Sequence, residues 1–259
     1  MLSQPIRPRP RDFNHINHSI SDQSWGQKVK SQQKATDGGN LNILLGASYF
    51  ERLSRPEHRH IYNDYFDGWR NHGIGGDRVE HIAWRIKNGC IPTNTTKVIL
   101  SAGTNNIGKN DPMHIAISII QCVLDIKKLA PNAEILVIGI LPRAVRDLDD
   151  HEGGEHIRWI NSFLKQKLSN VCQYHEPNCH LWKKHSFNPS FYKHDNVHLN
   201  NGGYTKLFND LITFIHSNKQ PINYNYIDDV IGRHENITPL PTPTPSSLHS
   251  PTSLPSFRP

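Results

Sequence analysis

The sequence lacks the long apolar run that a membrane-spanning helix requires. No stretch of about 18 consecutive apolar residues occurs among its 259 residues. Its first residues, MLSQPIRPRPRDF, also lack the apolar core of a signal peptide. These absences argue against a transmembrane or exported protein, and they make the cytoplasm the expected location.

Cysteine is scarce and is not arranged in metal-binding or redox motifs. The four cysteines are Cys90, Cys122, Cys172 and Cys179. None forms a CxxC pair, which argues against a zinc ribbon or a thioredoxin-like site. His58 and His60 could suggest a metal, but no third ligand is identifiable, so a solvated loop is the better interpretation. We therefore expect neither a metal nor another cofactor.

The charge is mildly basic, with 29 Lys and Arg against 23 acidic residues and a formal net charge of +6. Part of the excess lies near the N-terminus, at positions such as Arg7, Arg9 and Arg11. No aromatic residues interleave with a basic cluster, as a single-strand stacking platform would require. Nucleic-acid binding is therefore a minority interpretation.

The sequence is low in hydrophobic residues, at 36%, and they are unevenly distributed. Apolar runs crowd between residues 41 and 215, whereas both ends are polar and rich in proline. This pattern predicts a flexible N-terminal segment over 1–37, one globular domain over 38–218 and a mobile Pro/Ser/Thr-rich tail over 219–259. Within the first segment, a short helix over 22–34 anchored by Trp25 is an alternative to a flexible chain.

Short apolar runs alternate with longer amphipathic segments in the central part of the sequence. The runs predict strands over 41–46, 69–72, 97–103, 134–141 and 171–175. The amphipathic segments predict helices over 77–89, capped by Asp77, and over 111–130, 152–168 and 202–216. This alternation is typical of a three-layer α/β/α sandwich around a five-stranded parallel sheet. Such folds place their functional residues in loops at the carboxyl ends of the strands.

Four polar segments occur in such loops. They are Gly46-Ala47-Ser48, GIGGD over 73–77 (with His72 before it), GTNN over 103–106 and DNVH over 195–198. Each has a simpler interpretation: Ser48 could cap a helix, the glycines could form a tight turn, and Asn105 and Asp195 could be turn residues. A dinucleotide-binding motif is excluded because the third glycine of GxGxxG is missing.

The blocks NHGIGGD…WRIKNG, AGTNN, GILPR and DNVHLNNGGYTKL resemble, in order and spacing, those of the SGNH, or GDSL-type, hydrolases. Within that family they are most similar to the catalytic subunits of intracellular platelet-activating-factor acetylhydrolase. The resemblance spans about 41–214. It implies a flavodoxin-like sandwich and a metal-independent serine esterase for small acyl esters, with acetyl favoured.

The resemblance implies a role for each matching residue. Ser48 would be the nucleophile, His198 its general base, and Asp195 the carboxylate that orients the imidazole. The separation of three residues lets one short loop present both Asp195 and His198. The oxyanion would be held by the backbone N–H groups of Ser48 and Gly76 and by the side-chain amide of Asn105. Gly76 is preferred to Gly75 because it directly precedes Asp77.

One position departs from the family pattern, which reads Gly-Asp-Ser where this chain has Gly46-Ala47-Ser48. The missing aspartate is not the triad acid, but its absence could lower activity. A non-catalytic binding module for RNA or a protein partner is therefore the alternative function. The resemblance further implies an acetylated lipid or sugar as the substrate class and a homodimer as the assembly. Arg143 is predicted at the substrate rim or in solvent, and Trp182 and Phe187 as packing residues.

Overall fold

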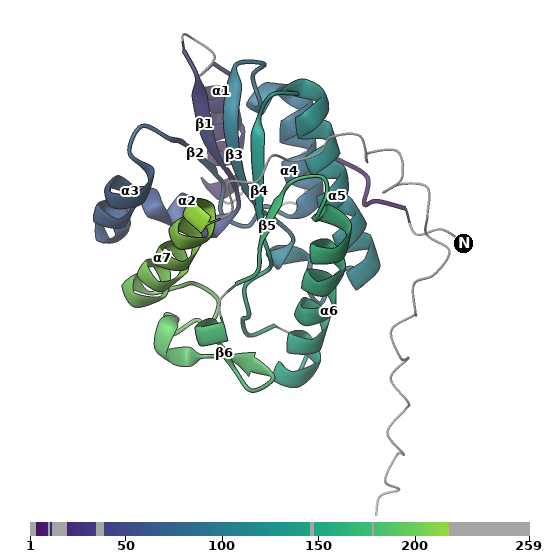
Figure 1. Cartoon of the computed structure of the whole chain (residues 1–259), viewed down its shortest axis with the longest axis vertical. Coiled ribbons are helices and arrows are strands. Elements are labelled where there is room, and N and C mark those ends of the chain that lie inside the picture. The colour runs from purple at the N-terminus through teal and green to yellow at the C-terminus, as the bar shows by residue number, and fades with distance from the viewer. Residues whose placement is uncertain are drawn as a thin grey trace, which may run out of the picture.

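The computed structural model describes residues 4–9, 11, 20–34, 39–145, 148–177 and 179–217. Its centre is a parallel sheet of five strands in the order β2-β1-β3-β4-β5 (Figure 1). The strands are β1 (Leu41–Gly46), β2 (Arg70–Gly73), β3 (Thr95–Ser101), β4 (Glu134–Ile138) and β5 (Gln173–His175). The chain order reverses at β1, so β1 and its neighbours form the switch point at which such sheets bind ligands.

Helices connect the strands and cover the sheet. They are α1 (Ile20–Lys34), α2 (Ser48–Glu51), α3 (Arg59–Phe66), α4 (Val79–Arg85), α5 (Pro112–Leu129), α6 (Asp150–Leu168) and α7 (Asn201–Ser217). Single turns of helix lie at Arg52–Ser54, Pro56–His58, Ile86–Cys90, Thr104–Asn106, Cys179–Leu181 and Pro189–Phe191. A small antiparallel hairpin pairs β6 (Trp182–Lys183) with β7 (Ser186–Phe187).

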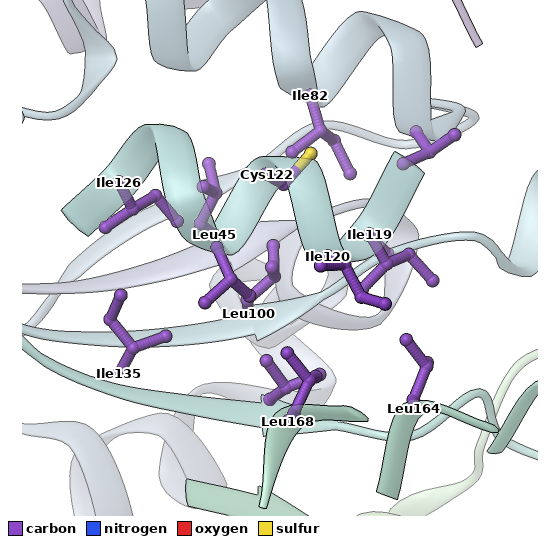
Figure 2. Close-up of a cluster of buried hydrophobic side chains, with 14 of the residues drawn as sticks. Leu45, Ile82, Leu100, Ile119, Ile120, Cys122, Ile126, Ile135, Leu164 and Leu168 are labelled. Carbon is purple, nitrogen blue, oxygen red and sulfur yellow. The ribbon is translucent and has the colours of Figure 1, made fainter. Parts of the chain in front are cut away.

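Alternation along each central strand divides the core into two layers. Leu45 of β1, Leu100 of β3 and Ile135 of β4 face α4, α5 and α6, and Figure 2 shows them meeting side chains from these helices. The neighbouring residues Leu44 and Ile99 point to the opposite face. There they pack with side chains of α2, α3 and α7. Because strand side chains alternate, apolar residues at consecutive positions allow both faces to be covered.

The observed sheet and its helices confirm the predicted α/β/α sandwich with five parallel strands. Two details differ. Strand β4 ends at Ile138, short of the predicted residue 141. Asp77 does not cap α4: Arg78 occupies the N-cap position, and Asp77 is fully buried in an ion pair with Arg85. The sequence pattern did not predict α2, α3 or the β6–β7 hairpin, because these elements are too short to show a period.

The N-terminal helix α1 packs onto the domain. Trp25 is only 2% exposed, and with Val29 it contacts Ile74 and Cys90. This confirms the alternative of a Trp25-anchored helix for residues 20–34, so that part of the segment predicted to be flexible is held in place. The tail over 219–259 lies outside the described residues, and the proposed domain limits stay predictions. Among the described helices, none is long and apolar enough to span a membrane.

Candidate active site

The predicted site residues gather at the carboxyl ends of β1, β2 and β3. Ser48 follows β1 directly, as the first residue of α2. Gly76 follows β2, and Asn105 lies in the turn Thr104–Asn106 after β3. The loop before α7 carries Asp195 and His198 to the same edge. There the His198 ring lies within hydrogen-bond distance of the Ser48 hydroxyl. Residues separated by 150 positions thus become neighbours.

Three of these side chains form a continuous hydrogen-bonded chain. The Oγ of Ser48 lies 3.0 Å from Nε2 of His198. Nδ1 of the same ring lies 2.7 Å from Oδ2 of Asp195. An ionised carboxylate only accepts hydrogen bonds, so Nδ1 carries the ring hydrogen and Nε2 is left to accept from the serine hydroxyl. This is the geometry that general-base activation of a serine requires.

The surroundings keep Asp195 ionised and His198 neutral. Partial burial alone would raise the pKa of Asp195, but hydrogen bonds from the backbone and ring of His198 and from the Val197 N–H lower it to about 2. Burial lowers the pKa of His198 below its usual value, and the positive charges of Arg52 and Arg55 add to this against the opposing effect of Asp195. A neutral imidazole at neutral pH can accept a proton at once.

The loop that carries His198 is fixed by its own backbone. The Oδ1 of Asp195 accepts hydrogen bonds from the N–H groups of Val197 (3.0 Å) and His198 (2.9 Å). Asn196, which lies between Asp195 and Val197, adopts a left-handed conformation with φ at 53°. Asparagine tolerates this conformation better than most residues. Tyr192 and Leu199 pair as an antiparallel bridge at the base of the loop. The carboxylate therefore orients the imidazole and also shapes the turn that presents it.

Two tyrosines that the sequence analysis missed join the Ser48 and His198 segments. The hydroxyl of Tyr49 donates to the carbonyl of Val197 at 2.9 Å. The hydroxyl of Tyr204, in α7, donates to the carbonyl of Tyr49 at 2.8 Å. Both rings are buried. Tyr49 directly follows the predicted nucleophile, but in a linear sequence nothing indicates that its hydroxyl reaches residue 197.

The predicted oxyanion residues lie along the β2 and β3 loops. The side-chain amide of Asn105 donates one hydrogen bond, 2.9 Å long, to the carbonyl of Asp77, which leaves its second hydrogen available. Gly76 has φ at 76°, a backbone conformation that favours glycine. The N–H of Gly75 instead donates to the Glu51 carboxylate, which contributes to the lowered pKa of Glu51.

A buried charged network, also missed, lies beneath these loops. Arg85 is fully buried and pairs with Asp77 at 2.9 Å. Its guanidinium also donates to the carbonyls of Gly46 and His72, at the ends of β1 and β2. Asp77 further accepts a hydrogen bond from the indole of Trp25. The network ties α1, α4 and both strand ends to the segment that precedes Ser48.

A cleft of about 550 Å³ opens beside the triad. Asn105, Arg143, Asp195 and Val197 contribute to its lining, and Lys109 lies on its wall. Arg143 thus takes the first of its two predicted positions, at the rim of the candidate substrate site. Ala47, which departs from the Gly-Asp-Ser pattern that the resemblance implies, is 3% exposed and lies at the N-cap of α2 without a side-chain cap.

The other candidate residues lie elsewhere. Nδ1 of His58 is 2.6 Å from Oδ1 of Asn201, in a buried contact unlike a metal site. Trp182 packs under the guanidinium of Arg158, and Phe187 is buried, so both are packing residues. Among the described residues, His, Cys and carboxylate side chains come together as a possible metal-ligand set at His151, Glu155 and His185, all exposed.

Comparison with known proteins shows which family and which proteins this chain is similar to. The model of the GDSL-like Lipase/Acylhydrolase family matches residues 37–206. The platelet-activating factor acetylhydrolase IB subunit beta homolog of Drosophila melanogaster is 36% identical over 132 residues, which cover 50% of this chain and 57% of the relative. The human platelet-activating factor acetylhydrolase IB subunit alpha2 is 32% identical over the same length, covering 56% of that protein. The matches thus span little more than half the length of these relatives.

A solved structure supports the fold. A GDSL-like lipase from Bacteroides thetaiotaomicron superposes with a TM-score of 0.62 at 17% identity, covering 74% of this chain and 97% of that one. At this identity the likeness concerns the fold alone. The family model, however, covers well over half of the chain and includes the segments of Ser48, Gly76, Asn105, Asp195 and His198. The chain therefore belongs to the GDSL-like lipase/acylhydrolase family.

Proposed function

We propose that the chain is a serine esterase that hydrolyses small acyl esters, with acetyl as the favoured acyl group. One observation carries the proposal: the hydrogen-bonded chain from Ser48 through His198 to Asp195, with its links of 3.0 and 2.7 Å. Membership of an acylhydrolase family supports it. The relatives that are named acetylhydrolases support acetyl over longer acyl groups.

In the first half of the proposed reaction, the Oγ of Ser48 attacks the ester carbonyl carbon while Nε2 of His198 takes the hydroxyl proton. The negative charge on Asp195 stabilises the imidazolium that forms. The carbonyl oxygen becomes an oxyanion, which accepts hydrogen bonds from the N–H groups of Ser48 and Gly76 and from the free hydrogen of the Asn105 amide. Collapse of the intermediate breaks the bond to the alcohol, which leaves with the proton from His198.

In the second half, water replaces the alcohol. His198 removes a proton from the water molecule, whose oxygen attacks the acyl-Ser48 carbonyl, and the same donors hold the second oxyanion. Collapse releases the carboxylic acid and returns the proton to Ser48. We choose Gly76 over Gly75 as a donor because the Gly75 N–H is engaged by Glu51. Each step is supplied by side-chain and backbone groups of this chain.

The test is labelling by a fluorophosphonate probe, together with hydrolysis of p-nitrophenyl acetate. The wild-type protein should be labelled and should release p-nitrophenol. Ser48→Ala should abolish labelling and lower kcat/KM by roughly 10³-fold or more. Ser169→Ala, at an exposed serine after α6, is the matched control and should behave as wild type. A folded wild-type protein that is neither labelled nor active would overturn the proposal.

The same experiment separates esterase activity from the binding-module alternative. That alternative rests on Ala47 and on the net charge of +6. A module of this kind would bind RNA with an affinity that falls as salt rises, and it would show no turnover. Since a binding module does not require a serine, histidine and aspartate in hydrogen-bonded register, the triad geometry favours the esterase.

A further inference from the structure

We propose that the cleft beside Ser48 is a subsite for an anionic group, so that the preferred ester carries a carboxylate or a phosphate. This inference rests on the proposed esterase function and specifies its substrate class. It is drawn from two cations of the cleft wall, Lys109 and Arg143, which form no ion pair with a carboxylate among the described residues. The cleft borders the proposed reaction centre, because Asn105 and Asp195 line it.

Arg143 is the first of these cations. It follows Pro142 in the loop after β4, and its Nε is buried without a hydrogen-bond partner. The titratable groups that interact with the Arg143 guanidinium are the phenols of Tyr49 and Tyr192, and neither is a carboxylate. Burial raises the pKa of both tyrosines, that of Tyr49 to about 12, so both are neutral at neutral pH.

Both phenols are also occupied. Tyr49 donates its hydroxyl hydrogen to the Val197 carbonyl, and Tyr192 donates to the Pro142 carbonyl. They therefore fix the walls around Arg143 without neutralising it. A buried guanidinium nitrogen without a partner carries a desolvation cost. An anion that enters the cleft would remove that cost by accepting hydrogen bonds from the guanidinium.

Two further cations contribute: Lys109 on the cleft wall and Arg52 beside His198. Lys109 lines the cleft, in the loop that leads to α5. Arg52, after α2, is close enough to His198 to lower the pKa of its imidazole, and the Arg52 Nε is also buried without a hydrogen-bond partner. Within the ranges that the structure describes, neither Arg52, Lys109 nor Arg143 forms an ion pair with a carboxylate.

The negative charges nearby are already engaged. Asp195 is the carboxylate among the lining residues, and its oxygens accept hydrogen bonds from the His198 ring and from two backbone N–H groups. Glu51 pairs with Lys28 of α1. The positive charge of Arg55 also contributes, because it lowers the pKa of both Glu51 and His198. The cleft is therefore an electropositive site, which attracts anionic substrates and raises their local concentration.

Arginine sets the chemical class of the ligand. Its planar fork of N–H donors matches the two oxygens of a carboxylate or phosphate. With the anion on Arg143, the ester carbonyl can occupy the space between Ser48 and Asn105. A neutral ester of the same size leaves the Arg143 charge uncompensated, so discrimination is expected in kcat/KM.

The test compares esters that share size and acyl group but differ in charge. We expect para-acetoxybenzoate and para-acetoxyphenyl phosphate to be hydrolysed with kcat/KM at least about tenfold above neutral para-acetoxybenzamide. The two anionic substrates distinguish a carboxylate from a phosphate ligand. The preference should shrink as ionic strength rises, because salt screens the attraction.

Variants assign the preference to the cleft. Arg143→Gln should reduce the ratio of anionic to neutral kcat/KM about tenfold, and Lys109→Gln should reduce it less, because an exposed ammonium attracts more weakly. Arg70→Gln, at an exposed arginine that begins β2 at the opposite end of the sheet, is the matched control and should leave the ratio unchanged. Thermal melting of each variant reports whether it is folded.

The outcomes separate this inference from the proposed function. Equal kcat/KM for the charged and neutral esters, or an unchanged ratio in Arg143→Gln, overturns the anionic subsite and leaves the esterase intact. If no ester is hydrolysed and no probe labels Ser48, the esterase fails. The subsite is then judged by calorimetric titration of the Ser48→Ala protein. Tighter binding of para-acetoxybenzoate than of para-acetoxybenzamide, lost in the additional Arg143→Gln variant, supports it, and equal binding overturns it.

Discussion

At the residue scale, the proposed mechanism makes the reactivity of Ser48 depend on the protonation state of His198. Its pKa lies below the usual value because burial and the nearby arginines disfavour the imidazolium. The base must be neutral, so activity is present above this pKa and is lost as pH falls through it. We expect kcat/KM for p-nitrophenyl acetate to reach half its plateau below pH of about 6.5.

The control for this pH profile is spontaneous hydrolysis measured with Ser48→Ala protein. Asp195, with a pKa of about 2, stays ionised across the same range and adds no second transition. Its depressed pKa stabilises the fold above the usual carboxyl range, and that contribution is lost only as pH falls towards 2. If kcat/KM reached half its plateau only above pH of about 6.5, the result would contradict the assignment of His198 as the base.

Tyr49 provides a second prediction at this scale. Tyr49→Phe removes the hydrogen bond to the Val197 carbonyl and leaves that carbonyl without its partner. We expect a loss of about 1 kcal/mol in the free energy of unfolding and a several-fold decrease in kcat/KM, because the His198 loop is held less firmly. Urea denaturation and p-nitrophenyl acetate kinetics measure the two effects.

The matched control is Tyr65→Phe. Its hydroxyl donates to Asn209 on the outer side of α3 and α7, away from Ser48. We expect this variant to keep wild-type kcat/KM. An equal loss of activity in both variants would show that the Tyr49 bond has no particular effect on the His198 loop.

At the element scale, the indole of Trp25 is the largest buried group that α1 adds to the domain. Trp25 is buried against Ile74, and its Nε1 donates to Asp77 at 2.9 Å. Trp25→Ala should lower the free energy of unfolding by about 3–5 kcal/mol, because it creates a cavity and removes a partner of a buried carboxylate. Lys30→Ala, exposed on the same helix, should cost about 0.5 kcal/mol or less.

Urea denaturation of the two variants tests this prediction. Since Asp77 follows Gly76 and its carbonyl binds Asn105, kcat/KM should fall in Trp25→Ala under conditions in which the protein remains folded. A Trp25→Ala protein as stable as Lys30→Ala would mean that α1 does not contribute to the folded domain.

At the scale of the whole molecule, the domain should unfold as one unit, and three thiols can report it for the side of the sheet that α1, α4, α5 and α6 cover. Cys90, Cys122 and Cys172 are buried and free. Burial raises the pKa of Cys90 to about 11 and of the other two to about 12, so thiolate is scarce as well as inaccessible. In a Cys179→Ser background, these thiols should react with Ellman's reagent only as fast as the domain unfolds.

The control is the same reaction in denaturing urea, where all three thiols should react immediately. If one thiol reacts in the native protein well before the far-ultraviolet circular dichroism signal is lost, the part of the core around that thiol opens locally. The thiols come from the turn after α4, from α5 and from the residue that precedes β5. They therefore sample three different elements of the core on one side of the sheet.

The sequence by itself determined the sheet and the candidate site residues that follow its strands. Consecutive apolar residues in β1, β3 and β4 indicate strands buried on both faces, because side chains alternate. Parallel strands then bring their carboxyl ends to one edge, which places Ser48 and Asn105 near each other. The spacing of Asp195 and His198 is local, and a three-residue separation is sufficient to place both in one turn.

Only the tertiary structure decided the contacts between distant segments. The Tyr49–Val197 hydrogen bond, the Arg85–Asp77 pair and the cleft that Lys109 and Arg143 line together join side chains from different loops. No period or spacing relates these positions, since their distances depend on how the helices pack against the sheet. For the same reason Asp77 was predicted as a helix cap and is instead a buried partner of α1 and α4. Sequence indicates which groups can react, whereas packing decides which charges surround them.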